Sequence, residues 1–458
     1  MARFDKSSAA ARGRYATQSR ECLCMEGALF PIVIFVLVYI AISLELVNKA
    51  VAALLGVMLL LMAHVVSEHE ALAFIDTETI MLLLGMMTIV AILRRTGVFT
   101  LLSVKIAEQT KGSPLRILIF FSIVTALLSA FLDNVTTVLI VIPIVIELTT
   151  GMGLDPKLFV ISQAVISNIG GTATLIGDPP NIIIGSKGGL TFNQFLLNLA
   201  FPIMLCFVVG LIYLWGANRD KFRPIDTNLT KLFSVQLLLE KIRNEFLVKR
   251  IDRVFLVKGL ACLALAIMLF VTQTLTGLSP GVVALTVALV LIVLTRLDVE
   301  HLMEEIEWTT LLFFAGLFIL VGILEEKQVL DWIAHNVFMR VGDNPYVIVL
   351  MVLWVSGIVS GFLDNIPFTI TMIPIVHLIM ENTPIPNNIL WWALSLGACL
   401  GGNLTMIGAS ANIVSVGIAK RHNIAIRFLD FMRVSAMITL ITLMVSSLFL
   451  MLYLWISL

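Results

Sequence analysis

The chain is short of charged residues and of cysteine, and each shortage excludes a class of protein. Only 13% of the 458 residues are charged, 59% are hydrophobic, and the mean hydropathy is +1.03. A soluble globular domain carries about 25% charged residues, so that class is excluded. Five cysteines are too few, and odd in number, for a disulfide-stabilised scaffold.

The chain also lacks an excess of basic residues. Its 30 Lys and Arg residues balance 30 Asp and Glu residues, so no basic surface is available to meet phosphates, and we expect no nucleic-acid partner. No nucleotide-binding loop of the GxxxxGK type is present. Use of ATP would therefore require a separate ATPase subunit.

What the sequence has in abundance is long apolar runs. Runs of about 17 to 25 residues cross a bilayer core of roughly 30 Å, so they predict an all-α integral membrane protein with many spans in contact with lipid. One polar stretch, 1–25, precedes these runs, and a second, 218–256, separates them into two groups. The second stretch is rich in Lys and Arg. We expect a polar N-terminal tail and an aqueous linker there.

The membrane region contains an internal repeat. SAFLDNVTTVLIVIPIV (129–145) and SGFLDNIPFTITMIPIV (360–376) share nine of 17 residues, and GGTATLIGDPPNI (170–182) and GGNLTMIGASANI (401–413) share seven of 13 at the same spacing of 231. A gap-free spacing through polar motifs indicates duplication. We therefore expect a first transmembrane repeat at 26–217 and a second at 257–458.

Hydropathy gives each repeat the same elements. In the first repeat, spans are expected near 29–48, 50–65, 79–95, 157–186 and 195–216. Two apolar runs at 115–149 are interrupted near Asp133, and we interpret them as a re-entrant hairpin. Five crossings per repeat force the two repeats into inverted topology, with broken helices at the midplane, as in many secondary transporters.

The distribution of positive charge predicts the orientation. In this topology most of the 30 Lys and Arg residues fall on the face that carries the linker 218–256. Positive residues accumulate on the cytoplasmic side, so the linker is expected to be cytoplasmic. The basic residues of the tail 1–25 do not fit this rule, because this topology places them on the opposite face from the linker.

Polar residues and glycines gather in four segments that should lie at membrane depth. Two are the hairpin tips, and two are glycine-rich breaks at 170–181 and 401–412. Backbone that leaves a helix at this depth must be buried in protein or line a wet cavity. The tips contribute Asp133, Asn134, Thr136, Asp364, Asn365 and Thr369, and the first break contributes Thr172 and Asp178.

The carboxylates are the most informative of these side chains. An ionised Asp inside a bilayer is costly unless it is paired or hydrated, and Asp133, Asp178 and Asp364 have no Lys or Arg nearby in the sequence. A coupling ion, H⁺ or Na⁺, would compensate them, with Na⁺ bound at Asp133, Asn134, Asp364 and Asn365. The alternative is that each Asp only caps the helix that follows it, and capping is compatible with ion binding. We expect no other cofactor.

These motifs resemble the ArsB/NhaD branch of the ion transporter superfamily, especially the P-protein-like and citrate-transporter-like permeases. FLDNVTTVLIVIP and GGTATLIGDPPNIIIGS carry the resemblance, which covers about 26–450. It implies relatives that export arsenite or antimonite, exchange Na⁺ for H⁺, or move anions. More distant sodium-coupled dicarboxylate carriers have Ser-Asn-Thr at each tip and use an elevator motion. Related elevator carriers are often dimers, so the analogy predicts a homodimer.

The resemblance also assigns site residues. It places Asp133, Asn134 and Thr136 at the first tip and Asp364 and Asn365 at the second. On the broken helices it places Gly171, Gly177, Pro180, Asn181, Gly402, Asn403, Gly408 and Asn412. Asp replaces the Ser of the dicarboxylate carriers at both tips, and Pro367 stands where the first tip has Thr136. These departures favour a cation, a proton or a neutral metalloid acid over a dicarboxylate.

The leading hypothesis is a secondary active transporter, not an enzyme, that works by elevator-type alternating access. Proton-coupled efflux of arsenite or antimonite fits because As(OH)₃ is neutral near pH 7 and needs no Arg to bind it. Na⁺/H⁺ antiport and a sodium- or proton-coupled carrier of di- or tricarboxylate anions are the alternatives. An intramembrane aspartyl protease is a remote one, since two membrane Asp residues could share a proton. A channel remains open as a third class.

Overall fold

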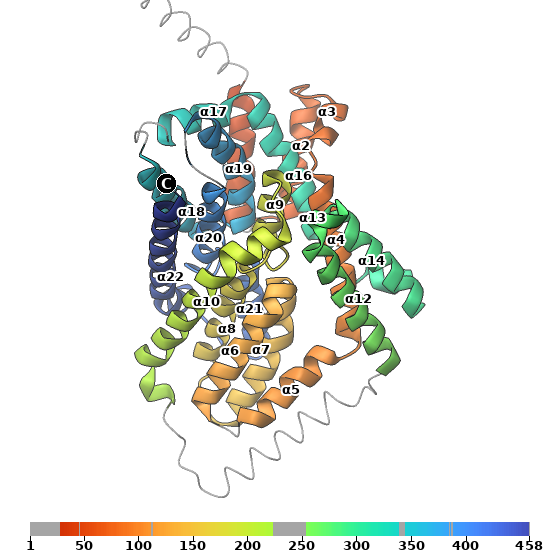
Figure 1. Ribbon diagram of the computed structural model, residues 1–458, viewed down its shortest axis with the longest axis vertical. Coiled ribbons are helices and arrows are strands. Elements are labelled where there is room, and N and C mark those ends of the chain that lie inside the picture. The colour runs from red at the N-terminus through yellow and green to blue at the C-terminus, as the bar shows by residue number, and fades with distance from the viewer. Residues whose placement is uncertain are drawn as a thin grey trace, which may run out of the picture. The chain divides into compact units, whose positions relative to one another are not determined.

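A computed structural model of the chain describes residues 28–44, 46–110, 113–222, 253–338, 344–383, 385 and 388–457 (Figure 1). Within these ranges every regular element is a helix, which confirms the all-α prediction. Among the described residues, eight helices are long and apolar enough to cross a membrane. The predicted tail at 1–25 and most of the predicted linker, 223–252, lie outside the described residues.

The first repeat folds into a series of helices that begins with Ala28–Ser43. The others, in chain order, are α2 (Lys49–Met62), α3 (Glu68–Ala73), α4 (Thr77–Arg95), α5 (Val98–Thr110), α6 (Pro114–Phe131), α7 (Asn134–Gly151), α8 (Lys157–Gly171), α9 (Pro179–Gly188), α10 (Phe192–Ala217) and the 3₁₀ turn η1 (Arg219–Phe222).

The second repeat follows the same plan. Its helices are α12 (Arg253–Val271), α13 (Gln273–Thr276), α14 (Pro280–Thr295), α15 (Val299–Met303), α16 (Trp308–Glu326), α17 (Val329–Ile333), η2 (Ala334–Phe338), α18 (Pro345–Phe362), α19 (Asn365–Asn382), α20 (Ile389–Gly401), α21 (Ser410–Arg421) and α22 (Phe428–Ser457).

Equivalent helices of the two repeats begin at the spacing found in the sequence. Lys49 opens α2 and Pro280 opens α14, a difference (280 minus 49) of 231 residues. The same difference separates the first residues of α4 and α16, α6 and α18, α7 and α19, and α9 and α21. The duplication therefore extends to the helix boundaries. The inverted orientation of the repeats and the re-entrant path of the hairpins stay predictions.

Local sequence explains where several helices start. Pro114, Pro280 and Pro345 occupy the first helical position, where a missing N–H costs nothing. Ser67 and Glu70 form a capping box at α3, in which each side chain accepts a hydrogen bond from the other's backbone N–H, at 3.3 and 2.9 Å. The positive φ angles of Gly153 and Gly189 end the turns after α7 and α9.

The predicted elements need additions, of which α5 is the longest. A helix, α5, lies between the third span and the hairpin, and α17 with η2 lies at the corresponding place in the second repeat. Hydropathy missed α5 because Lys105, Glu108 and Gln109 interrupt its apolar residues. The predicted break in 115–149 is confirmed as a break between helices, since α6 ends at Phe131 and α7 begins at Asn134.

The chain divides into two compact units that do not coincide with the two repeats. The first unit comprises residues up to Asp76, Trp308–Asp343 and Pro374–Asn382, and the second comprises the rest. In the first unit, α16 of the second repeat packs on α2 of the first, with Gly316 against Ala53. In the second unit, α4 of the first repeat packs on α12 and α14 of the second. Each compact unit thus combines helices of both repeats.

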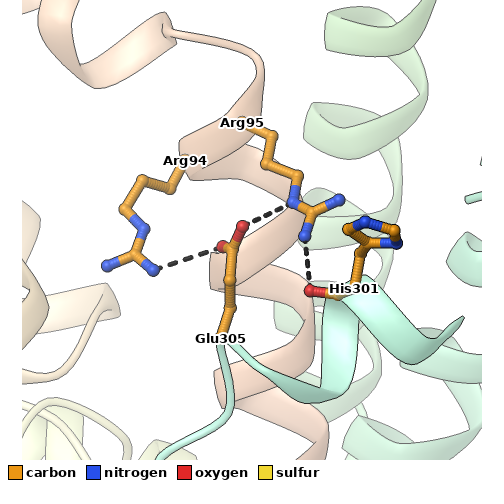
Figure 2. Close-up of polar contacts among 4 residues, drawn as sticks. All are labelled: Arg94, Arg95, His301 and Glu305. Atoms are coloured by element: carbon orange, nitrogen blue, oxygen red, sulfur yellow. Dashed lines mark hydrogen bonds and ion pairs between the residues drawn. The ribbon is translucent and has the colours of Figure 1, made fainter. Parts of the chain in front are cut away.

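Within the second unit, ion pairs join α4 to the segment that follows α15 (Figure 2). Arg94 Nη2 and Arg95 Nε lie 3.2 and 2.6 Å from the two carboxylate oxygens of Glu305, and Arg95 Nη2 donates to the carbonyl of His301 at 2.6 Å. The His301 ring hydrogen-bonds Asp298 and lowers the pKa of that carboxyl. The side chains of Arg94, Arg95 and Glu305 are partly exposed, so their two ion pairs contribute about 0–1 kcal/mol each.

The second unit also contains the bundle that positions the candidate site. Helices α6, α7 and α8 stand side by side in Figure 1, and α21 of the second repeat packs against α7 and α8. Small residues permit the close contacts: a Cβ on Gly170 would lie 2.5 Å from Ala126 Cα, and a Cβ on Gly397 would lie 2.6 Å from the Leu353 carbonyl oxygen. Helix α8 therefore contacts the α6 backbone directly, and α20 contacts α18 in the same way.

The contact of Gly170 with α6 predicts a stability effect. Gly170→Ala places a methyl group against backbone atoms, so α6 and α8 must separate, and we expect a loss of about 1–3 kcal/mol. Thermal unfolding of the detergent-solubilised protein measures this loss. Gly417→Ala is the matched control, because nothing lies within 4 Å of its added Cβ. Equal melting temperatures for the two variants would contradict the close contact.

Candidate functional site

The two hairpin tips place an Asp at the start of a helix. Asp133 Oδ1 accepts from Thr136 N at 2.8 Å and caps α7, and Asp364 Oδ1 accepts from Ile366 N at 3.2 Å at the start of α19. Capping is thus confirmed for Asp133, and Asp364 makes the corresponding local bond. Asp364 Oδ2 also accepts from Ser410 Oγ of α21 at 3.3 Å, which links the second tip to the second broken helix.

Each tip is fastened to the broken helix of its own repeat by hydroxyl groups. Ser129 Oγ donates to the Ser167 carbonyl at 2.7 Å, and Ser360 Oγ donates to the Ala398 carbonyl at 2.6 Å. In the same way, Thr174 Oγ1 donates to Ala130 O, and Thr405 Oγ1 donates to Gly361 O. The tips are therefore packed against the glycine-rich breaks.

An Asn holds each break open in the same geometry. Asn181 Nδ2 donates to the carbonyls of Thr172 and Thr174 at 3.1 and 2.9 Å. Asn412 Nδ2 donates to the carbonyls of Gly402 and Thr405, both at 2.9 Å. Carbonyls that leave a helix in a water-poor interior need such donors. These two predicted residues therefore stabilise the unwound backbone.

A second set of hydrogen bonds joins the two repeats. Asn168 Nδ2 donates to Asn403 Oδ1 at 2.8 Å and to Asn412 Oδ1 at 3.0 Å, and Asn134 Nδ2 donates to Asn168 Oδ1 at 3.2 Å. From the other side, Ser395 Oγ donates to Asn181 Oδ1 at 2.6 Å, and Cys399 Sγ lies 3.5 Å from the same oxygen. The structure thus brings Asn134, Asn403, Asn412 and Asn181 into one buried network across the repeats.

Asp178 has a different environment from the other two acids. It is 2% exposed, and its side chain makes no cap hydrogen bond, so the capping interpretation is wrong for this residue. The reason is local: Pro179 and Pro180 occupy the first two helical positions and have no N–H to donate, and the N–H of Asn181 at the third position donates to the Asp178 carbonyl at 2.9 Å.

The carboxyl group of Asp178 faces side chains from both repeats. Cys399, Asn134 and Asn365 surround it, and the charge of Asp364 acts on it. Among the described residues, Asp178 Oδ2 has no hydrogen-bond partner, and the same holds for Asn365 Nδ2 and Asn403 Nδ2. Three fully or almost fully buried polar groups are thus available to bind something other than protein.

The predicted glycines are required by close contacts. A Cβ on Gly171 would overlap Asn134 Oδ1, and a Cβ on Gly177 would lie 2.6 Å from the Ser129 carbonyl oxygen. A Cβ on Gly408 would lie 2.7 Å from the Gly402 carbonyl oxygen, and the reciprocal distance at Gly402 is 2.9 Å. A side chain at Gly171 or Gly177 would displace the first tip from the first break, and a side chain at Gly402 or Gly408 would force apart the two sides of the second break.

Several predicted residues have hydroxyls that are already used within their own helix. Thr172 Oγ1 donates to Asn168 O and Thr369 Oγ1 donates to Asn365 O, each at 2.7 Å. Thr136 contributes its backbone N–H to Asp133, and Pro180 removes a donor beside Asp178. These four residues shape the site through the backbone.

Sequence reasoning missed six residues of this network, which are Ser129, Ser360, Asn168, Thr174, Thr405 and Ser395. A signal for four of them was present, since Ser129 matches Ser360 and Thr174 matches Thr405 between the repeats. Asn168 and Ser395 have no such signal: their equivalents are Cys399 and Ala164. Within the described residues, no three His, Cys, Asp or Glu side chains are grouped to hold a metal ion, and the predicted Na⁺ site stays a prediction.

Comparison with known proteins identifies the family. The family model described as "Citrate transporter" matches residues 39–397. An uncharacterized transporter of Mycobacterium tuberculosis is 40% identical over 433 residues, which cover 93% of this chain and 97% of that protein. A 46 kDa membrane protein of Mycobacterium leprae is 38% identical over 430 residues, with the same two coverages.

More distant relatives share part of their length or the fold alone. The human P protein is 33% identical over 474 residues, which cover 86% of this chain and 56% of that protein, so the chain spans about half of the P protein. The crystal structure of the YdaH transporter of Alcanivorax borkumensis, which has an unusual topology, aligns with a TM-score of 0.55 at 12% identity. The alignment covers 82% of this chain and 85% of that one. With its apolar helices, its paired tips and breaks, and these relatives, the chain belongs to the citrate transporter family of multi-pass membrane transporters.

Proposed function

We propose that this transporter is a secondary active carrier in which Asp178, together with Asp133 and Asp364, binds the coupling cation during alternating access. The observation that carries the proposal is the Asp178 carboxyl group, which is 2% exposed and has one oxygen without a partner among the described residues. A buried carboxyl group is stable when it is protonated or bound to a cation. Its neighbours Cys399, Asn134 and Asn365 are neutral, and Asp364 is acidic, so none of them neutralises it.

The cargo that fits this site best is a small neutral hydroxy acid, arsenite or antimonite, exported in exchange for protons. The network around Asp178 is built mainly of amides and hydroxyls, which donate and accept hydrogen bonds without adding positive charge. A neutral hydroxide can bind such groups without a Lys or Arg. Protonation of the acids on one side of the membrane then removes the charge that would oppose movement across it. The tips and broken helices move together, as in an elevator.

Na⁺/H⁺ antiport is the second candidate, and a different aspect of the same site favours it. Carboxylate and amide oxygens are the ligands that hard cations prefer, and Asp178 Oδ2 is unused. The predicted Na⁺ ligands Asp133, Asn134, Asp364 and Asn365 all lie on the two tips that flank it. In this case Na⁺ and H⁺ compete for the same carboxylates.

A di- or tricarboxylate anion is the cargo that the description of the family model names. It is the third candidate, because the acidic side chains of Asp133 and Asp364 at the tips would repel an anion. Cotransported Na⁺ or H⁺ would then have to neutralise both the cargo and the site.

Ion fluxes in proteoliposomes distinguish these functions. With an internal pH-sensitive dye, an arsenite gradient is expected to drive proton movement through the purified protein, because one species crosses in exchange for the other. A Na⁺ gradient and a citrate gradient are the parallel measurements, and protein-free liposomes are the control. Proton movement with Na⁺ alone would favour the second candidate. The absence of proton or Na⁺ coupling with any of the three would reject the proposal.

Asp178→Asn tests the coupling role directly. The amide keeps the size of the side chain but cannot exchange a proton or compensate a cation, so coupled flux should fall by at least about tenfold, equivalent to about 1.4 kcal/mol. Asp155→Asn is the matched control, since Asp155 lies before α8 and its carboxylate accepts only a local bond from Lys157 N at 3.1 Å. Full coupled flux in Asp178→Asn would assign the coupling to another group.

A further inference from the structure

A column of polar side chains leads away from the first hairpin tip, between α6, α7 and α8. It consists of Ser122 and Thr125 on α6, Thr137 on α7 and Gln163 on α8, and all four are fully buried. Apolar residues normally fill such positions in a helix bundle, and none of these four belongs to the hydrogen-bond network around Asp178. Their polarity therefore needs an explanation of its own.

Three atoms of this column have no hydrogen-bond partner among the described residues. They are Ser122 Oγ, Thr137 Oγ1 and Gln163 Nε2, whereas Thr125 Oγ1 donates to Gln163 Oε1 at 2.7 Å. Other buried hydroxyls here donate to a carbonyl one turn earlier, as Thr149 does to Val145 O and Ser162 to Leu158 O. Ser122 and Thr137 do not, so their hydroxyls are free to bind another molecule.

The register of the helices shows that these atoms form a column. The bonds Thr125–Gln163 and Ser129–Ser167 join α6 to α8 at the same sequence separation, 38 residues, so the two helices run parallel and the first bond lies one turn below the second. Ser122 lies almost one further turn along the same face of α6. Thr137 is three residues after Asn134 on the returning helix α7, which places it about one turn from the tip, near the level between these two bonds. The column extends about 10 Å from the level of Ser129 to that of Ser122, at 1.5 Å per residue.

The second repeat has no such column. The residues at the equivalent positions of Ser122, Gln163 and Thr137 are Leu353, Leu394 and Phe368, all of which are buried. Ser356, the equivalent of Thr125, is left without a hydrogen-bond partner because Leu394 stands where Gln163 would be. Apolar side chains thus occupy, in the second hairpin, the positions that polar side chains occupy in the first.

We propose that this column, lined by Ser122, Thr125, Thr137 and Gln163, binds a chain of water molecules that carries protons to the acidic site from the side of the first hairpin only. Buried polar groups without protein partners are the usual binding sites of internal water, which makes about three hydrogen bonds. Each water passes one proton to the next water and receives one from the water behind it. The last proton goes to the carboxylate of Asp178, which lies beside Asn134. The proton-carrying role rests on the proposed function, whereas the water itself does not.

Cysteine accessibility tests for the water independently of transport. Ser122→Cys and Leu353→Cys occupy equivalent and equally buried positions of the two hairpins. The full-length protein is treated with 2-aminoethyl methanethiosulfonate, and peptide mass spectrometry separates the new thiols from the native ones. Ser122→Cys is expected to react at least about tenfold faster, because the reagent reaches thiols through water. Equal rates would overturn the water column.

Filling the column tests its role in proton movement. Gln163→Leu introduces the residue of the second repeat, and Thr137→Val removes a hydroxyl with little change in size. Each should slow proton flux by about tenfold in proteoliposomes while leaving arsenite or Na⁺ binding at fixed pH unchanged, since a factor of ten needs only about 1.4 kcal/mol on the barrier. Ser356→Ala is the control in the second hairpin and should change neither.

The outcomes separate the two proposals. Wild-type proton flux in both Gln163→Leu and Thr137→Val would overturn the proton path, even if Ser122→Cys reacts quickly. If the wild-type protein moves no protons at all, the proposed function fails, but the difference between Ser122→Cys and Leu353→Cys still decides whether the column holds water. Elution of each variant at the wild-type volume in size exclusion shows that it is folded.

Discussion

The structure depends on how the unwound backbone between α8 and α9, and between α20 and α21, is supplied with hydrogen bonds. A broken helix inside an apolar protein leaves carbonyls without donors, and each such group costs free energy. Asn181 and Asn412 supply those donors, and their own carbonyl oxygens accept from Ser395 and Asn168 of the other repeat. The same two side chains therefore maintain the breaks and fasten the repeats together. Mutual dependence of this kind explains why the breaks, the tips and the glycines occur as one set in both halves.

Near-symmetry is combined with functional asymmetry in this arrangement. The bracing hydroxyls of Ser129 and Ser360 are equivalent, so both tips are held in the same way. Asp178 and Asn168, by contrast, correspond to Ala409 and Cys399. The scaffold of the site is thus duplicated, while Asp178 and Asn168 occur only in the first repeat and Asn403, the equivalent of Thr172, occurs only in the second. The buried network is therefore completed by different side chains from the two repeats.

The sequence predicted those parts of the fold that repeat or that follow from hydropathy. The duplication, the interruption near Asp133 and the glycine breaks all follow from residue patterns at a constant spacing. Helix α5 was missed because a mixed composition gives no clear hydropathy signal. Asn168 was missed for another reason: it lies inside a regular helix and matters because Asn134, Asn403 and Asn412 of other segments meet its side chain. Contacts between distant segments leave no trace in the spacing of a single sequence.

The difference between Asp178 and Ala409 has a consequence for the electrical behaviour of the carrier. Under the proposed function, an acid at both positions would bind two coupling cations in each transport cycle, whereas Asp178 opposite Ala409 binds one. The number of cations bound helps to set whether a complete cycle displaces net charge, and so whether the membrane voltage drives it. A single substitution at either position would then change how strongly the voltage acts on transport.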